Sequence, residues 1–229
     1  MALDLGRIRA ICFDIDGTLA DTDDLWVQRF ARILRPLNWL FPRFNIYAPA
    51  RRLVMGINNP ANFGLQVLDT LGWDDEITAL ARRLRRKGEA PGAKLSMIEG
   101  IRPMLAALRA RYPLAVVSAR EEQGSRQFLD KYDLTGFFQA VITAQSAEYS
   151  KPRPDPLLLA ARLLGVPAEA CLMVGDTLAD IRCGKAAGAQ TVGVLCGFGH
   201  EGELRRRGAD LILASTAQLA DRRTQTTDR

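Results

Sequence analysis

The chain has 229 residues, 48% of them hydrophobic and 25% charged, which is typical of a globular protein and excludes a disordered or fibrous one. It has no run of about 18 apolar residues, which excludes a membrane-spanning helix, and its first residues are too few and too polar for a signal peptide. The net charge is +5, but no aromatic residues interleave with the arginine clusters, so we expect solvated surface and not a nucleic-acid site.

The N-terminal part of the sequence predicts one buried strand followed by a helical insertion. Residues 8–15 form an apolar run that ends in the carboxylate-rich turn from Asp14 to Thr18. From residue 20 to residue 92, apolar residues recur at helical spacing, and no convincing strand pattern is present. We therefore predict two parts, a core of residues 1–19 and 93–229 and an all-helical insertion of residues 20–92.

From residue 100 onward, helical and strand patterns alternate. The strands are predicted at residues 114–118, 140–143, 171–175, 191–195 and 211–214, and the helices at residues 102–111, 122–132, 155–164, 181–187 and 201–207. This alternation predicts an α/β fold with a doubly wound, Rossmann-like parallel sheet. Ligands of such sheets bind beyond the carboxyl ends of the strands.

Polar residues lie at the ends of four of these strands. They are Asp14, Asp16 and Thr18 at the end of the run of residues 8–15, Ser118 at the end of the strand of residues 114–118, Lys151 in the loop after residues 140–143, and Asp176 and Asp180 after residues 171–175. The predicted fold brings them to one edge of the sheet, where the carboxylates would repel one another. A hard divalent cation removes that repulsion, and Mg²⁺ favours a few carboxylates together with waters and phosphate oxygens. The pattern therefore predicts a Mg²⁺ site and a bound phosphate group.

The first strand end carries the groups that phosphate-ester hydrolysis needs. This reaction is among the slowest uncatalysed ones, with enzymatic accelerations of up to about 10²¹-fold. Asp14 can attack phosphorus and form an aspartyl phosphate. Asp16, two positions on and on the same side of an extended chain, can protonate the leaving alcohol. Gly17 allows the chain to turn sharply just beyond.

The motifs Asp14-x-Asp16-Gly17-Thr18, Ser118, Lys151 and Gly175-Asp176-x-x-x-Asp180 resemble, in this order, the four motifs of the haloacid dehalogenase (HAD) superfamily. The resemblance covers about residues 8–219, and the insertion lies where this superfamily places its C1-type cap. It implies that Asp14 is the nucleophile and a Mg²⁺ ligand, and that Asp16 is the general acid/base with its backbone carbonyl on the metal.

The same resemblance implies roles for the remaining motif residues. Thr18 and Ser118 hold the transferred phosphoryl group, and Lys151 neutralises both Asp14 and the phosphoryl oxygens. Asp176 is a direct metal ligand. Asp180 binds the metal directly or orients a metal-bound water, since relatives divide this work differently.

The C-terminal part narrows the resemblance to one branch of the superfamily. Lys151-Pro152-x-Pro154-x-Pro156 and the later Gly197-Phe198-Gly199 are similar to phosphoglycolate phosphatase-like enzymes. This branch implies a Mg²⁺-dependent phosphatase that hydrolyses a small phosphorylated metabolite through an aspartyl phosphate. Because caps select substrates in this superfamily, and residues 20–92 match no familiar cap well, the physiological substrate stays open.

Two alternative functions stay open as well. A phosphosugar mutase of the β-phosphoglucomutase type shares all four motifs. A non-catalytic HAD-like binding protein would share the fold, although such proteins commonly lose the nucleophile or a metal ligand. Single residues also have plainer interpretations, with Ser118 as a turn cap, Lys151 as a surface lysine and Asp180 as a helix-start carboxylate favoured by the helix dipole.

The cysteines indicate the redox state of the protein. The four of them have no metal-site spacing, and Cys12 and Cys171 lie in strand-like apolar runs. We therefore expect reduced, buried thiols in a cytoplasmic protein. We further expect a monomer or homodimer that binds a small phosphorylated substrate and neither nucleic acid nor membrane.

Overall fold

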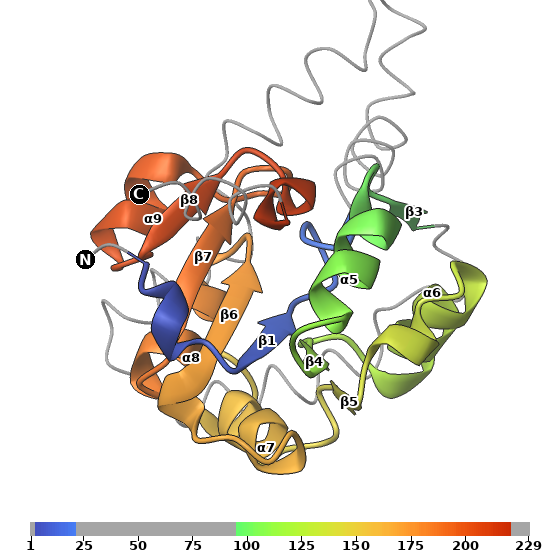
Figure 1. The fold of residues 1–229 in the computed structure, drawn as a ribbon, viewed down its shortest axis with the longest axis horizontal. Helices are drawn as coiled ribbons and strands as arrows, with labels where there is room; N and C mark the ends of the chain where they lie inside the picture. The colour runs from blue at the N-terminus through green and yellow to red at the C-terminus, as the bar shows by residue number, and fades with distance from the viewer. Residues whose placement is uncertain (1–2, 22–94, 221–229) are drawn as a thin grey trace, which may run out of the picture. The chain divides into compact units, whose positions relative to one another are not determined.

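The computed structural model describes residues 3–21 and 95–220 of the chain. These residues form a six-stranded sheet of order β5-β4-β1-β6-β7-β8, in which all neighbouring strands run parallel (Figure 1). The strands are β1 (Ala10–Phe13), β4 (Leu114–Val117), β5 (Ala140–Ile142), β6 (Cys171–Gly175), β7 (Gln190–Val194) and β8 (Leu211–Leu213). The predicted parallel sheet is therefore confirmed.

The helices of the described residues follow the predicted order along the chain. They are α5 (Ile101–Arg109), α6 (Glu122–Lys131), α7 (Asp155–Leu163), α8 (Leu178–Ala186) and α9 (Glu201–Arg206). Figure 1 shows α5 and α6 beside β4 and β5. Helix α8 begins at Leu178 and not at residue 181 as predicted, because Thr177 and Asp180 form a capping box that satisfies the first backbone N–H groups.

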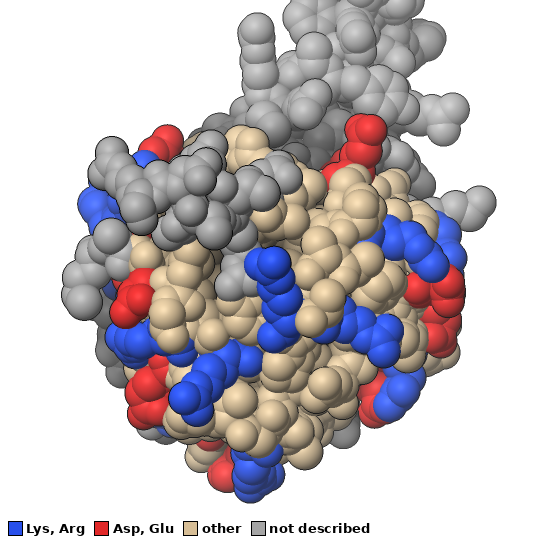
Figure 2. Space-filling view, in the orientation of Figure 1, with Lys and Arg blue, Asp and Glu red and all other residues tan. Residues whose placement is uncertain are grey.

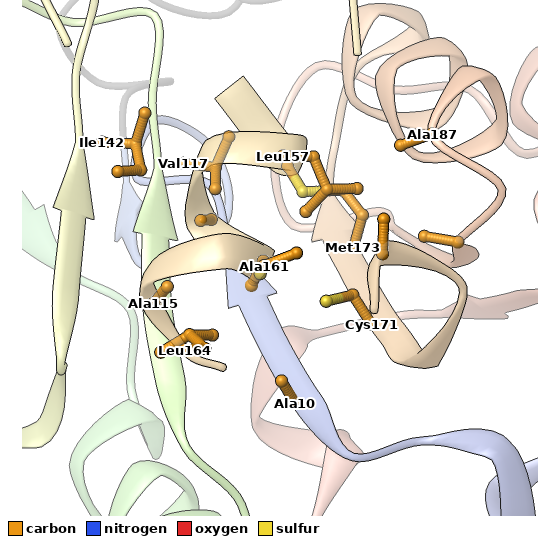
Figure 3. Close-up of a cluster of buried hydrophobic side chains, with 14 of the residues drawn as sticks. Ala10, Ala115, Val117, Ile142, Leu157, Ala161, Leu164, Cys171, Met173 and Ala187 are labelled. Atoms are coloured by element: carbon orange, nitrogen blue, oxygen red, sulfur yellow. The ribbon is translucent and has the colours of Figure 1, made fainter. Parts of the chain in front are cut away.

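The central strand β1 is buried on both of its faces. Ala10 and Cys12 belong to a core cluster with side chains of α7 and α8, including Leu157, which Figure 3 shows packed over the sheet. Since side chains alternate along a strand, Ile11 and Phe13 point to the opposite face, where they are also buried. All four side chains of β1 are therefore buried and apolar, and the first polar side chain is that of Asp14, directly after the strand ends at Phe13.

Two short antiparallel strands flank the segment that the structure does not describe, one before it and one after it. Strand β2 (Ala20–Asp21) pairs with β3 (Ser96–Met97), which corrects the expectation that residues 20–92 contain no strand. By its internal contacts, the chain divides into one unit of Met1–Thr22 with Ser96–Arg229 and a second unit of Asp23–Leu95. The helical structure predicted for residues 20–92 lies outside the described residues, which include only the two residues of β2 from that range.

Three further expectations concern the charged surface, membrane-spanning helices and the cysteines. On the face shown in Figure 2, lysine and arginine side chains lie in separate groups, with acidic side chains among them. Within residues 3–21 and 95–220, no helix combines the length and the apolar character that crossing a membrane requires. All four cysteines are free thiols; Cys12, Cys171 and Cys183 are buried as expected, whereas Cys196 is partly exposed.

Candidate active site

The turn that follows β1 fixes the position of Asp14. The Asp14 N–H extends the β1–β6 ladder with a hydrogen bond of 2.9 Å to Val174 O. Just beyond, Ile15 O accepts hydrogen bonds from the N–H groups of residues 18–20. Gly17 has a φ of +72°, and a Cβ at this position would overlap the carboxylate of Asp176. The turn therefore requires glycine for its conformation and for its close approach to a second strand end.

Lys151 lies at the centre of the site and joins three strand ends. Its Nζ is 2.8 Å from Asp14 Oδ1 and 2.6 Å from Asp180 Oδ1, and it donates a hydrogen bond of 2.9 Å to Val117 O at the end of β4. The Lys151 side chain is only 4% exposed. The structure thus brings Asp14, Lys151 and Asp180 together as predicted, and Lys151 is not a surface lysine.

Asp180 uses both of its carboxylate oxygens. Oδ1 accepts from Lys151, while Oδ2 accepts from the backbone N–H and the hydroxyl of Thr177, at 3.0 and 2.6 Å. A Cβ on Gly175 would overlap this side chain, so glycine is required where β6 meets α8. Asp180 is therefore a helix-start carboxylate that also holds Lys151, and its contacts with protein donors on both oxygens favour positioning over direct contact with a metal.

Asp176 is fully buried, and a later loop holds its carboxylate. Asp176 Oδ2 accepts a hydrogen bond of 2.8 Å from the Phe198 N–H, whereas Asp176 Oδ1 is buried without a hydrogen-bond partner. A Cβ on Gly197 would overlap the same carboxylate, and one on Gly199 would overlap the Asp176 backbone oxygen. Sequence reasoning left this Gly-Phe-Gly loop without a role at the site. Its glycine spacing after a strand was the signal that could have identified it.

The buried carboxylates form a group that fits a divalent cation. Asp14, Asp176 and Asp180 each offer one oxygen, and these oxygens lie within 4.8 Å of one another. The unpartnered Oδ1 of Asp176 points to a ligand that supplies positive charge, because a buried polar atom without a partner is costly. The donor set is oxygen only, as Mg²⁺ prefers. The side chain of Asp16 is not a member of this group.

The electrostatics of the group show the same deficit of positive charge. Burial raises the pKa of Asp14 to about 7; Lys151 opposes this rise, and the negative charges of Asp180 and Asp16 add to it. Burial also raises the pKa of Asp176 well above its ordinary value, with help from the charges of Asp180 and Asp14. Burial disfavours the charge of Lys151, but Asp14 and Asp180 outweigh it and raise the pKa of Lys151. One ammonium therefore does not balance the buried carboxylates.

Ser118 and Thr18, the two predicted phosphoryl-binding residues, are both buried. Ser118 follows β4 directly, so it lies at the same sheet edge as Lys151, and its backbone N–H donates to Ile142 O. Its Oγ accepts a hydrogen bond of 3.2 Å from the Arg120 N–H. Thr18 Oγ1 has no hydrogen-bond partner, while Thr18 O accepts from the Thr216 hydroxyl at 2.7 Å.

The carboxylate of Asp16 contacts Arg120, a residue that the sequence motifs did not identify. Arg120 donates from Nε to Asp16 Oδ2 at 3.1 Å and from Nη2 to Asp16 Oδ1 at 2.6 Å. The two residues are separated by 104 positions. No spacing rule connects them, although the position of Arg120 just after Ser118 at a strand end was a usable signal.

The chain is similar to known hydrolases over most of its length. The model of the haloacid dehalogenase-like hydrolase family matches residues 11–194. An N-acetylmuramic acid 6-phosphate phosphatase of Pseudomonas aeruginosa is 30% identical, with 94% of each chain covered. A phosphoglycolate phosphatase of Escherichia coli is 28% identical, covering 93% of this chain and 91% of the relative.

The fold recurs in solved structures. A HAD family hydrolase from Deinococcus radiodurans, with bound phosphate and sodium, superposes with a TM-score of 0.66 at 24% identity, with 96% of each chain covered. This likeness extends through the described sheet and supports the fold assignment. With the family model and the relatives above, it completes the case: the chain belongs to the haloacid dehalogenase-like hydrolase family and is a phosphatase.

Proposed function

We propose that the protein is a Mg²⁺-dependent phosphomonoester hydrolase that works through an aspartyl phosphate on Asp14. The observation that carries this proposal is the position of Lys151, which is buried between Asp14 and Asp180 at 2.8 and 2.6 Å. A buried ammonium beside a strand-end carboxylate offers a site where a phosphoryl group can approach an anionic nucleophile without prohibitive repulsion.

The chemistry follows from the placement of the side chains. A carboxylate oxygen of Asp14 attacks phosphorus, and the bond from phosphorus to the ester oxygen breaks. Asp16 gives its proton to the departing alkoxide, which leaves as the alcohol. A water then attacks the aspartyl phosphate and passes a proton to Asp16, so that inorganic phosphate leaves and Asp14 is restored. Lys151, Ser118 and Thr18 hold the phosphoryl oxygens during both steps.

Asp14 and Asp176 are the residues that would hold the metal, with the backbone carbonyl of Asp16. Bound there, Mg²⁺ supplies positive charge to the phosphoryl oxygens and to the carboxylates. Asp180 contributes through Lys151, since both of its oxygens already have protein partners. The Phe198 N–H orients Asp176 so that the unpartnered Oδ1 is left for the cation.

We propose that the substrate is a small phosphorylated metabolite and that residues 20–92 form a helical cap that selects it. The relatives named for their substrates support this class, because phosphoglycolate and N-acetylmuramic acid 6-phosphate are both small phosphorylated acids. These two compounds and pyrophosphate, the substrate of a further relative from Halalkalibacterium halodurans that is 27% identical, are the first to assay.

Phosphate release is expected to depend on Mg²⁺. With p-nitrophenyl phosphate as substrate, EDTA is expected to abolish turnover and excess Mg²⁺ to restore it, because Lys151 alone does not balance the buried carboxylates, which repel the phosphoryl group when no divalent cation is present. Inorganic phosphate is measured directly, with a Mg²⁺-only blank as the control. Full turnover in EDTA would contradict the proposed site. Conversion of a hexose 1-phosphate to its 6-phosphate isomer without free phosphate would show a mutase instead.

Stability without a divalent cation is expected to fall as the pH rises from about 4 to about 7. In that range the folded protein binds more protons than the unfolded chain, because burial raises the pKa of Asp14 from 3.8 to about 7. The stability that protonated Asp14 provides is full below pH 4 and is lost as the pH rises through about 7. Urea unfolding in EDTA at a series of pH values measures this slope.

The matched control for the pH series is Asp14→Asn, which does not titrate. Its free energy of unfolding is expected to fall less steeply with pH than that of the wild-type protein. Mg²⁺ is expected to stabilise the wild-type protein more at pH 8 than at pH 5. Identical slopes for the two proteins in EDTA would contradict the assignment of the raised pKa to Asp14.

A further inference from the structure

The segment after β4 has a second feature besides Ser118, the arginine two positions on. The Arg120 side chain forms a two-point contact with Asp16, with both carboxylate oxygens bound at 3.1 and 2.6 Å. Such fork-like pairs fix the orientation of a carboxylate, which a single lysine contact does not. The Arg120 side chain is 14% exposed and that of Asp16 is 34% exposed, so the pair is partly sheltered from solvent.

Two hydrogen bonds fix the backbone of Arg120, and its stem lies close to a glycine of α6. The Arg120 N–H donates to Ser118 Oγ at 3.2 Å, and its carbonyl accepts from the Ala144 N–H at 3.0 Å. The side chain passes over Gly124 in the first turns of α6, where an added Cβ would lie 3.3 Å from Nη1 and 3.4 Å from Cδ. Glycine inside a helix costs roughly 1 kcal/mol relative to alanine. At this position it leaves room for the arginine.

From these contacts we infer that Arg120 is a positioning residue that holds Asp16 in place for its two proton transfers. The inference rests on the proposed function, in which Asp16 is the general acid/base. A carboxylate with one-third of its side chain exposed otherwise samples several rotamers, and each departure from the productive one slows proton transfer. One oxygen of Asp16 can carry the proton while the other stays bound to Arg120.

If Arg120 positions Asp16, the loss of kcat/KM on its removal depends on the leaving group of the ester. A merely structural role predicts no such dependence. Phenyl phosphate and p-nitrophenyl phosphate have similar shapes, but phenolate leaves poorly without a proton and p-nitrophenolate leaves well. General acid catalysis contributes about 10²–10⁴-fold. Arg120→Met is therefore expected to lower kcat/KM on the order of 10²-fold for phenyl phosphate and less than about tenfold for p-nitrophenyl phosphate. Arg120→Lys keeps the charge but not the fork, so it stays impaired.

Three companion variants keep the test independent of folding. Gly124→Leu fills the space beside Arg120 with a good helix former, and it is expected to show the same bias against phenyl phosphate with no loss of melting temperature. Gly202→Leu is its control, because a Cβ on Gly202 in α9 meets nothing within 4 Å. Arg126→Met, which removes an exposed ion pair with Glu122 on α6, is the control for Arg120→Met.

The decisive measurement is a double-variant cycle with Asp16→Asn. If Arg120 acts through Asp16, Arg120→Met lowers phenyl phosphate turnover in the wild-type background and has no further effect in the Asp16→Asn background. Equal losses in both backgrounds, or a rise in KM with unchanged kcat for both esters, would overturn the inference. If Asp16→Asn hydrolyses phenyl phosphate as the wild-type protein does, it is the general acid/base assignment of the proposed function that fails.

Discussion

Asp14→Asn is expected to lower phosphate release on the order of 10⁴-fold or more, the scale on which loss of a covalent nucleophile acts in other hydrolases. The amide has nearly the same shape as the carboxylate, but it cannot attack phosphorus. The fold is expected to persist, because Lys151 keeps Asp180 and Val117 as partners. In EDTA at pH 8 the variant is expected to be at least as stable as the wild-type protein, since burial raises the pKa of Asp14 and disfavours its charge.

Two measurements establish the nucleophile. Initial rates with p-nitrophenyl phosphate measure the loss, and the mass of acid-quenched protein detects one added phosphoryl group in the wild-type protein and none in the variant. Asp133→Asn is the control, because Asp133 is exposed, pairs with Arg102 at the surface and has a φ of +53° that asparagine tolerates. A phosphoryl adduct on the Asp14→Asn protein would contradict the assignment.

The arrangement of the four motifs was predictable because it depends on topology alone. Apolar runs separated by helical patterns predict parallel strands, and the carboxyl ends of parallel strands meet at one edge. Once β1, β4 and β6 are neighbours, Asp14, the Val117 carbonyl and Asp180 are close enough for one buried lysine to contact all three. The pattern needed no knowledge of side-chain conformation to predict this convergence.

The contacts that orient these residues were not predictable, because they depend on the reach of single side chains. Arg120 reaches from the end of β4 to Asp16 on the neighbouring strand end, which no periodicity records. The Phe198 N–H reaches Asp176 from the loop after β7 only because glycines on both sides leave room. The early start of α8 has a local signature, Thr177-x-x-Asp180, that the apolar pattern alone overlooked.

Lys151→Met is expected to abolish turnover and to lower the free energy of unfolding by about 3–5 kcal/mol, the cost of leaving buried charges without their partner. The methionine fills the space of the stem but leaves Asp14 Oδ1, Asp180 Oδ1 and Val117 O without the ammonium. Turnover is lost because no fixed cation then draws the phosphoryl group to Asp14. Urea unfolding in EDTA at pH 8 measures the first effect, and phosphate release in excess Mg²⁺ measures the second.

The double variant Asp14→Asn/Lys151→Met separates the electrostatic cause from a packing defect. Removing the Asp14 charge lowers the repulsion that Lys151→Met exposes, so Asp14→Asn is expected to stabilise the Lys151→Met protein by more than it stabilises the wild-type protein, while the double variant remains inactive. Lys131→Met, at the exposed end of α6 beside the Tyr132 ring, is the control and is expected to lower stability by no more than about 1 kcal/mol, the value of an exposed cation–π contact. If Asp14→Asn changes stability by the same amount in the wild-type and Lys151→Met backgrounds, the loss in Lys151→Met comes from packing, and Lys151 does not act as the counter-charge of Asp14.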